Sequence, residues 1–183
     1  MWYIIGMNKE IKDVLADSIR GFRLPRYHEL PDMGLYLEQV TKYINQKIEP
    51  LGFDVLTGSM IRNYVKQGLV SNPVNKQYSA NQVAHLIAIA VLKQTIPLEH
   101  ISSFFSLQQK TYTVEVAYNY FCEELENILY YRFGLKGEFD SVGITDTLVK
   151  EMLRSAIIAV SHIVYLNACL KVLNNKPLQA DQL

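Results

Sequence analysis

Residues 56–70 read L-T-G-S-M-I-R-N-Y-V-K-Q-G-L-V, and this stretch decides the predicted fold. Thr57 suits a helix N-cap, because its hydroxyl can accept a hydrogen bond from a backbone N–H that the first turn leaves unpaired. Gly68 stands where the left-handed residue that ends a helix is expected. The residues between them are therefore predicted to form a short helix.

The predicted helix has two different faces. Apolar side chains share one face at three-to-four spacing: Ile61, Tyr64, Val65 and Leu69. The opposite face carries Ser59, Arg62, Asn63 and Lys66. Donor-rich side chains of these types bind base edges and phosphates in DNA complexes. A surface helix with a solvated polar face has the same pattern, so this segment alone allows both interpretations.

The residues that follow predict which elements come after this short helix. Residues 71–78, S-N-P-V-N-K-Q-Y, are too short for another helix, and their Pro and Asn favour a tight turn or small wing. Ser79 then caps an apolar helix over about residues 83–92, and Pro97 opens the next one, since proline is tolerated in a first helical turn. With a helical pattern over residues 35–48 ahead of them, the order is that of a winged helix-turn-helix.

Two sets of motifs resemble known families. T-G-S-M-I-R-N-Y-V-K-Q-G-L (57–69), K-Q-Y-S (76–79) and P-L-E-H-I (97–101) resemble the MerR-type winged helix-turn-helix. L-P-R-Y-H-E-L-P-D-M-G-L-Y (24–36), taken with residues 59–69, is more closely similar to the bacterial family catalogued as domain of unknown function 1836. The resemblance covers about residues 24–110, and it implies a DNA-binding transcriptional regulator.

In that interpretation the helix over residues 59–67 enters the major groove of double-stranded DNA. Arg62 and Asn63 are expected to recognise bases, and Ser59 and Lys66 to contact phosphates or flanking bases. Lys76 in the wing is expected to contact the DNA backbone or the minor groove. Tyr64 is expected to be structural.

One departure from the MerR pattern changes the expected contacts. The helix after Ser79 is often Arg-rich in MerR-type proteins, but residues 83–92 carry no charge here and are expected to be buried on most sides. Such a helix cannot supply the phosphate contacts that dominate DNA affinity. Binding would then depend on Arg62, Lys66, Lys76, Lys42 and a second subunit.

The length, composition and charge of the chain limit the kinds of protein it can be. The chain has 183 residues, of which 49% are hydrophobic and 20% charged, so it holds enough apolar material for one domain or two small ones. The formal net charge is zero, so non-specific electrostatic binding of nucleic acid by the whole chain is not expected. Residues 1–110 carry a balance of +3 and residues 111–183 one of −3, which suits a basic recognition region on an acidic body.

The C-terminal part predicts two long helices, over about residues 114–133 and from residue 145 or 146 to 174. Residues 155–170 contain no charged side chain, but this stretch is shorter than the roughly 20 residues that cross a bilayer. It is expected to be a central or dimer-forming helix, buried nearly all round. At about 1.5 Å per residue it spans about 45 Å, which favours a homodimer through the C-terminal helices.

No motif predicts catalysis, a metal site or a cofactor. The chain contains no glycine-rich phosphate loop and no paired histidines at ligand spacing, so we expect no enzyme. Cys122 and Cys169 are expected to be reduced core residues of a cytoplasmic protein. The many tyrosines of the C-terminal part favour core positions over an effector pocket, although both remain open.

The sequence therefore predicts an all-α protein with three parts. These are an N-terminal arm and helix (1–23), a winged helix-turn-helix (24–110), and a helical dimerisation or effector region (111–183). The leading function is sequence-specific DNA binding in transcriptional regulation. The alternative is a protein–protein adaptor, or a small-ligand-binding helical module, that keeps the helix-turn-helix as a scaffold.

Overall fold

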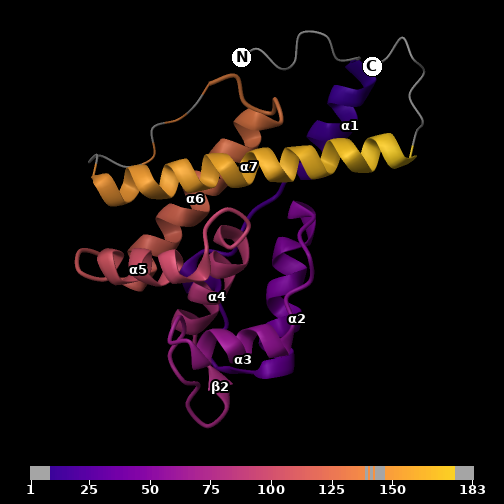
Figure 1. The fold of residues 1–183 in the computed structure, drawn as a ribbon. Coiled ribbons are helices and arrows are strands. Elements are labelled where there is room, and N and C mark those ends of the chain that lie inside the picture. Colours follow the sequence, from indigo (N-terminus) through magenta and orange to yellow (C-terminus); the bar gives the residue numbers. More distant parts are fainter. Residues whose placement is uncertain (1–8, 139, 141, 143–146, 176–183) are drawn as a thin grey trace.

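The computed structural model describes residues 9–138, 140, 142 and 147–175. The fold is largely α-helical, as expected, with one small sheet (Figure 1). Its helices are α1 (Lys9–Ile19), α2 (Leu37–Ile48), α3 (Gly58–Lys66), α4 (Ala80–Leu92), α5 (Leu98–Gln108), α6 (Val114–Arg132) and α7 (Leu148–Asn175). Two 3₁₀ turns, η1 (Tyr27–Glu29) and η2 (Glu49–Leu51), and two strands, β1 (Leu35–Tyr36) and β2 (Gln77–Tyr78), complete it.

The strands correct one expected helix boundary. Leu35 and Tyr36 were expected to begin a helix, but they form β1, which pairs antiparallel with β2 through Leu35–Tyr78 and Tyr36–Gln77. Gly34, with a φ of 73°, turns the chain into β1 where the Gln77 side chain comes close to it. Leu35 and Tyr36 form a strand because they pair with β2, which lies about 40 residues away in the chain. The local helical periodicity carries no information about this pairing.

Helix α4 forms the centre of the molecule. Ten of its thirteen residues are buried, as expected from its lack of charge, and it contacts α2, β2, α5, α6 and α7. Its N-cap is Ser79, whose backbone N–H donates to the Gln82 side chain at 2.8 Å. Gln82 also donates to the carbonyl of Ser71 at 2.8 Å, which ties together the two ends of the segment between α3 and α4.

Helix α7 lies across one end of the molecule, opposite the end formed by α3 and β2 (Figure 1). It packs mainly on α6 and α1. Within one copy of the chain this helix is not buried nearly all round, as a central helix would be: Leu153, Ile157, Val160 and Val164 face the core, but the other side is exposed. Within the described residues, α6 and α1 cover only one side of it.

Candidate nucleic-acid interface

Local hydrogen bonds hold α3 against α2. The side-chain amide of Asn45 in α2 donates to the carbonyl of Leu56 at 2.8 Å, and its oxygen accepts from the Leu56 N–H at 2.8 Å. The Thr57 hydroxyl accepts from the N–H of Met60 at 3.2 Å, which confirms the expected N-cap. Gly68 has a φ of 75° and ends the helix as expected. These hydrogen bonds fix Leu56 and Thr57, the two residues before α3, and so fix the direction in which α3 begins.

The two faces of α3 separate as the sequence predicts. Ile61 and Tyr64 are buried, which agrees with a structural role for Tyr64. The polar side chains are all exposed: Ser59, Arg62, Asn63 and Lys66. Within the described residues, these four side chains make one hydrogen bond, of 3.1 Å, from the Arg62 guanidinium to the Ser59 hydroxyl. These donors are therefore available to a partner molecule.

An open groove of about 450 Å³ lies between α2 and α3. Ser59 and Arg62 line it from α3, and Lys42 lines it from α2. Glu38, also in α2, is the acidic member of the lining. The structure thus brings Lys42 beside two of the residues that the sequence singled out.

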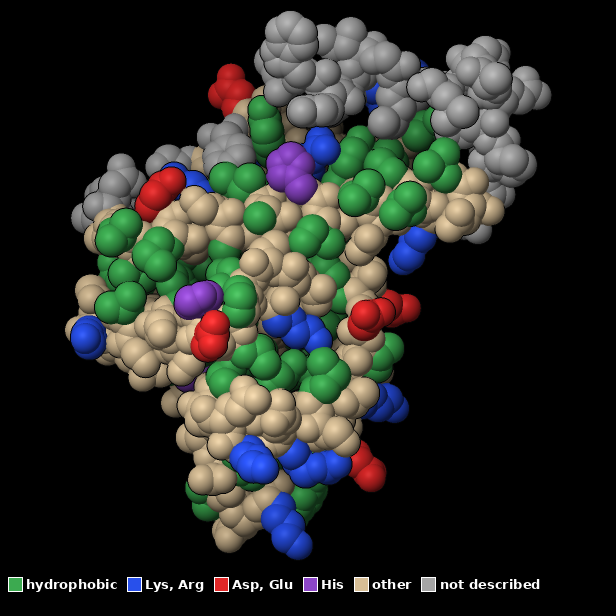
Figure 2. All heavy atoms as spheres, viewed as in Figure 1, with side chains coloured by type: hydrophobic (Ala, Val, Ile, Leu, Met, Phe, Trp, Pro, Cys, Tyr) green, Lys and Arg blue, Asp and Glu red, His purple; other side chains and the backbone are tan. Residues whose placement is uncertain are grey.

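Lys76 lies in the turn that leads into β2 and is exposed. Asn75 and Lys76 both have positive φ, and the Gln77 N–H donates to the carbonyl of Val74 at 2.8 Å to close the turn. Arg62 lies near enough to Tyr78 in β2 to act on its pKa, although burial is the larger effect and raises that pKa. Figure 2 shows Lys and Arg side chains gathered at the α3 and β2 end of the molecule.

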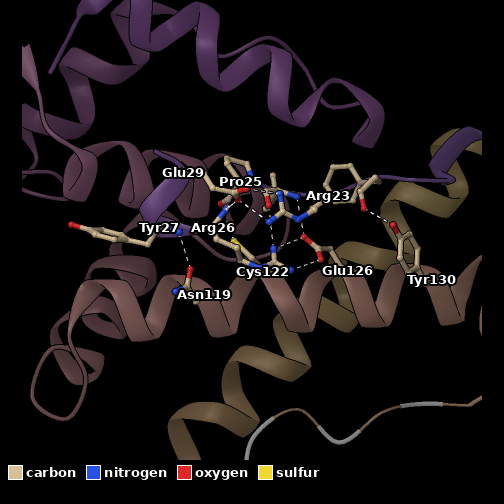
Figure 3. Close-up of polar contacts among 11 residues, drawn as sticks. Arg23, Pro25, Arg26, Tyr27, Glu29, Asn119, Cys122, Glu126 and Tyr130 are labelled. Carbon is tan, nitrogen blue, oxygen red and sulfur yellow. Dashed lines mark hydrogen bonds and ion pairs between the residues drawn. The ribbon is translucent and has the colours of Figure 1, made fainter. Parts of the chain in front are cut away.

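A second polar cluster was not identified from the sequence. We name it the α6 joint: Phe22, Arg23, Leu24, Pro25, Arg26, Tyr27 and Glu29, with Asn119, Cys122, Glu126 and Tyr130 of α6 (Figure 3). The guanidinium of Arg26 donates from Nη1 and Nη2 to the two carboxylate oxygens of Glu126, each at 2.7 Å. Glu126 also accepts from the Leu24 N–H at 2.9 Å. This pair joins residues 100 apart in the chain.

Further bonds at the α6 joint fix the backbone of the L-P-R segment. The Tyr27 N–H donates to Asn119 at 2.8 Å, and the Tyr130 hydroxyl donates to the carbonyl of Phe22 at 2.6 Å (Figure 3). The Cys122 thiol donates weakly to the carbonyl of Pro25, at 3.8 Å. The start of the motif that carries the family resemblance is therefore bonded to α6, and the same motif continues into β1.

The pKa shifts at the α6 joint favour the ionised forms of the paired arginine and glutamate side chains. The bond to Glu126 raises the pKa of Arg26 above its usual value. Hydrogen bonds from the Arg23 guanidinium, and then from the Arg26 backbone, lower the pKa of Glu29 to about 2. Burial raises the pKa of the Cys122 thiol to about 12, which disfavours the reactive thiolate, and Cys122 is buried as expected of a core residue.

Helix α7 presents a second exposed surface, which we call the outer face of α7. Its exposed members between residues 152 and 170 are all uncharged: Met152, Ser155, Ile158, Ala159, His162, Leu166 and Leu170. Burial, and then the nearby Arg132, lowers the pKa of His162, which favours the neutral form of this side chain. Figure 2 shows hydrophobic side chains along α7.

Of the described helices, α7 is long and apolar enough to cross a membrane. Over an 18-residue window its mean hydropathy is 1.8, and 28% of that window is buried. A core helix of a soluble protein passes the same test of length and composition, so the test does not assign α7 to a membrane. In the part of the chain that the structure describes, no group of three or more His, Cys, Asp or Glu side chains could hold a metal ion.

The chain was compared with protein families, curated proteins and solved structures. No curated protein and no solved structure matches it significantly. A family model described as "Domain of unknown function (DUF1836)" matches residues 25–121, which is more than half of the chain. The match begins at the L-P-R segment, includes α3 and the turn that leads into β2, and ends within α6 at residue 121. It therefore contains Arg26 and Asn119 of the α6 joint, whereas Glu126 lies beyond its end. The chain therefore belongs to the DUF1836 family.

Proposed function

We propose that this protein is a cytoplasmic transcriptional regulator that binds specific sequences of double-stranded DNA through a MerR-like winged helix-turn-helix. The observation that carries the proposal is the exposed polar face of α3, where Ser59, Arg62, Asn63 and Lys66 have few partners within the described chain. In this proposal α3 enters the major groove. Arg62 and Asn63 recognise bases, because their side chains can form paired hydrogen bonds with guanine and adenine edges.

The surroundings of α3 support this assignment. Lys42 across the groove and Lys76 in the wing add positive charge on either side of α3, and each is exposed. Phosphate contacts dominate DNA affinity and position the protein, whereas base contacts give specificity. In the proposed complex, Ser59, Lys66, Lys42 and Lys76 bind the backbone or flanking groups. Since α4 offers no cations, one copy of the chain makes few phosphate contacts.

A second copy would supply the missing contacts, and we propose a homodimer through the outer face of α7. Met152, Ala159 and Leu166 recur every seven residues, the period that two packed helices use. Exposed apolar patches of this kind mark interaction sites in soluble proteins. A twofold dimer would present two α3 helices to two half-sites, which is how helix-turn-helix proteins usually gain specificity.

Genome-wide capture of DNA bound to the tagged protein tests the DNA-binding proposal. The parent should enrich discrete sites that share a pseudo-palindrome, and a variant with Arg62→Ala and Lys66→Ala should lose them. The matched control carries Lys9→Ala and Lys110→Ala, which remove the same two charges from exposed positions away from α3. No enrichment by the parent, or equal enrichment by the Arg62 and Lys66 variant, would contradict the proposal.

Sedimentation of the full chain without DNA tests the dimer. Leu166→Glu introduces a buried charge only if the outer face of α7 is covered by a second copy, and it should then give a monomer. Leu107→Glu, at an exposed leucine in α5, should leave the parent state unchanged. A monomeric parent would contradict the dimer. Partition of the parent into lipid vesicles would contradict it as well, and would indicate a membrane as the partner of α7.

The alternative function is a protein–protein adaptor, and the uncharged outer face of α7 is the observation that favours it. A partner protein would then cover this face, and α3 would remain a structural helix without DNA. Purification under nuclease treatment distinguishes the two functions. An adaptor retains a stoichiometric partner that Leu166→Glu releases and Arg62→Ala leaves bound, whereas the DNA-binding dimer contains only copies of this chain.

A further inference from the structure

Arg132, the last residue of α6, lies against α7 without an acidic partner. Its guanidinium carbon lies 3.8 Å from the centre of the Tyr165 ring, so the cation stacks on the face of the ring. The side chain is half-buried, and its Nε is buried without a hydrogen-bond partner. Within the part of the chain that the structure describes, the guanidinium makes no hydrogen bond or ion pair. Arg132 is therefore held in place by Tyr165 and can still bind a carboxylate.

The Arg132 guanidinium lies at one edge of the outer face of α7. After burial, Arg132 is the group that lowers the pKa of His162, and it also opposes the effect of burial on the pKa of Cys169. The outer face is centred on the seven-residue series of Met152, Ala159 and Leu166. Tyr165 stands one position before this series, so it lies on one flank of the face, and Arg132 lies on the same flank.

This flank of α7 also carries a carboxylate. Glu151 stands 14 residues before Tyr165, which is two seven-residue repeats, so both lie on the same flank at positions about 21 Å apart. Glu151 is exposed and makes no ion pair within the described residues. Arg154, one turn further on, already donates to Glu124 at 2.6 Å. Within one copy, Glu151 is too far from Arg132 to pair with it.

The orientation of two copies decides whether these charges meet. When identical helices pack antiparallel about a perpendicular twofold axis, each flank meets the same flank of the other copy, whereas in parallel packing it meets the opposite flank. Ala159 is the small residue at the middle of the outer face, where two helices can approach closely. With the axis at Ala159, residue 151 of one copy lies opposite residue 167 of the other, within one turn of Tyr165.

We propose that a second copy of the chain packs antiparallel on the outer face of α7, and that Arg132 of each copy forms an ion pair with Glu151 of the other. The proposal rests on the homodimer proposed above and gives its orientation and the residue that each copy contributes. A twofold axis makes the contact twice in each dimer. In a parallel dimer the two groups would stay about 21 Å apart along the helices and on opposite flanks.

Oxidative cross-linking of the full chain without DNA tests the orientation. Met152→Cys, Ala159→Cys and Leu166→Cys are made singly in a Cys169→Ser background, which removes the half-buried thiol of α7. Ala159→Cys should link to itself at the axis. Met152→Cys and Leu166→Cys should link only when mixed with each other, because a disulfide needs Cα atoms within about 7 Å. Val14→Cys, at an exposed valine of α1, is the control and should not link.

Charge reversal tests the ion pair, with sedimentation of the DNA-free chain as the readout. Arg132→Glu and Glu151→Arg should each raise the dissociation constant of the dimer at least about tenfold, because like charges then face each other twice. An equimolar mixture of the two variants should recover the parent value within about threefold, since every Arg132 or Glu151 then meets an opposite charge. Recovery on mixing also shows that both variants are folded. Glu123→Arg, at an exposed glutamate of α6, is the matched control and should have no effect.

The outcomes separate this proposal from those before it. Self-linking by Met152→Cys and by Leu166→Cys would show a parallel pair, and a dimer that ignores charge reversal would lack the ion pair. Either result overturns the inference and leaves the homodimer standing. A monomeric parent, or a dimer in which Ala159→Cys does not link, would overturn the homodimer through α7 as well. Because no measurement uses DNA, failure of the DNA-binding proposal would not alter any of these outcomes.

Discussion

The α6 joint and the polar face of α3 use similar side chains in opposite ways. At the α6 joint, Arg26 and Glu126 form a bidentate pair whose side chains are only 17% and 12% exposed. On α3, Arg62 is exposed and donates only to the Ser59 hydroxyl within the described residues. An arginine whose hydrogen bonds are made inside the chain is structural, and one whose donors face water is available to a partner. The comparison therefore assigns the α6 joint to stability of the fold and makes the polar face of α3 the candidate surface for a partner.

The first and largest expected effect comes from breaking the α6 joint. Arg26→Ala leaves the Glu126 carboxylate partly buried without its cation, and losing one partner of a buried pair costs about 3–5 kcal/mol. Chemical denaturation monitored by circular dichroism measures this loss. Arg20→Ala is the control, because the Arg20–Asp17 pair is more than 60% exposed and should change stability by less than about 1 kcal/mol. Equal effects of the two variants would contradict a structural role for the α6 joint.

The second test applies the same substitution to α3. Arg62→Ala should leave the free energy of unfolding within about 0.5 kcal/mol of the parent, because the side chain is exposed. Under the proposed function it should weaken binding to the cognate DNA by about 1–3 kcal/mol, as loss of a base contact does. Denaturation and DNA titration of the same preparation measure both values. A loss of stability without a loss of binding would reverse the assignment of the two regions.

The third test distinguishes the roles of individual lysines at the proposed DNA-binding surface. Lys66→Ala and Lys76→Ala should each weaken cognate and random DNA to a similar extent, because phosphate contacts carry no sequence information. Each should also lower the slope of log affinity against log salt concentration by about 1. Titrations at several salt concentrations measure the slope. A substitution that reduces only cognate binding would assign that lysine to base recognition.

The smallest expected effect is at the rim of the α6 joint and depends on pH. The pKa of Glu29 is lowered from 4.5 to about 2, mainly by the Arg23 guanidinium. A lowered carboxyl pKa means that the pair stabilises the fold above about pH 4.5 and loses this contribution as the pH falls toward 2. Between those pH values the parent should lose more stability than Glu29→Gln, which has no carboxyl group there to protonate. Parallel curves of stability against pH would show that this pair contributes nothing to the fold.

Much of the fold followed from local chemistry. The Thr57 cap, the left-handed Gly68 and the apolar spacing of Ile61 and Tyr64 sufficed to predict α3 and its buried side. The absence of charge likewise predicted the burial of α4. These features depend on residues within one or two turns of each other, so a linear pattern contains them. The exposure of the polar face of α3 followed for the same reason.

The α6 joint could not be predicted in this way. Arg26 and Glu126 are 100 residues apart, and each alone resembles a surface charge. The sequence marked the L-P-R segment only through its family resemblance, which gives no structural partner. A signal was nonetheless present, because an arginine beside a proline, outside any helix, has no helical neighbour to pair with and must find a distant one or remain solvated.

Sequence alone determined where most of the helices lie, which side of α3 is apolar and which donors α3 offers. Those properties depend on backbone propensity and on the periodicity of side chains along one element. Only the tertiary structure decided where the elements meet. It gave Arg26 its partner, placed Lys42 across a groove from Arg62, left one side of α7 exposed and stacked Arg132 on Tyr165. Each of these depends on packing between residues distant in the chain, which no local pattern encodes.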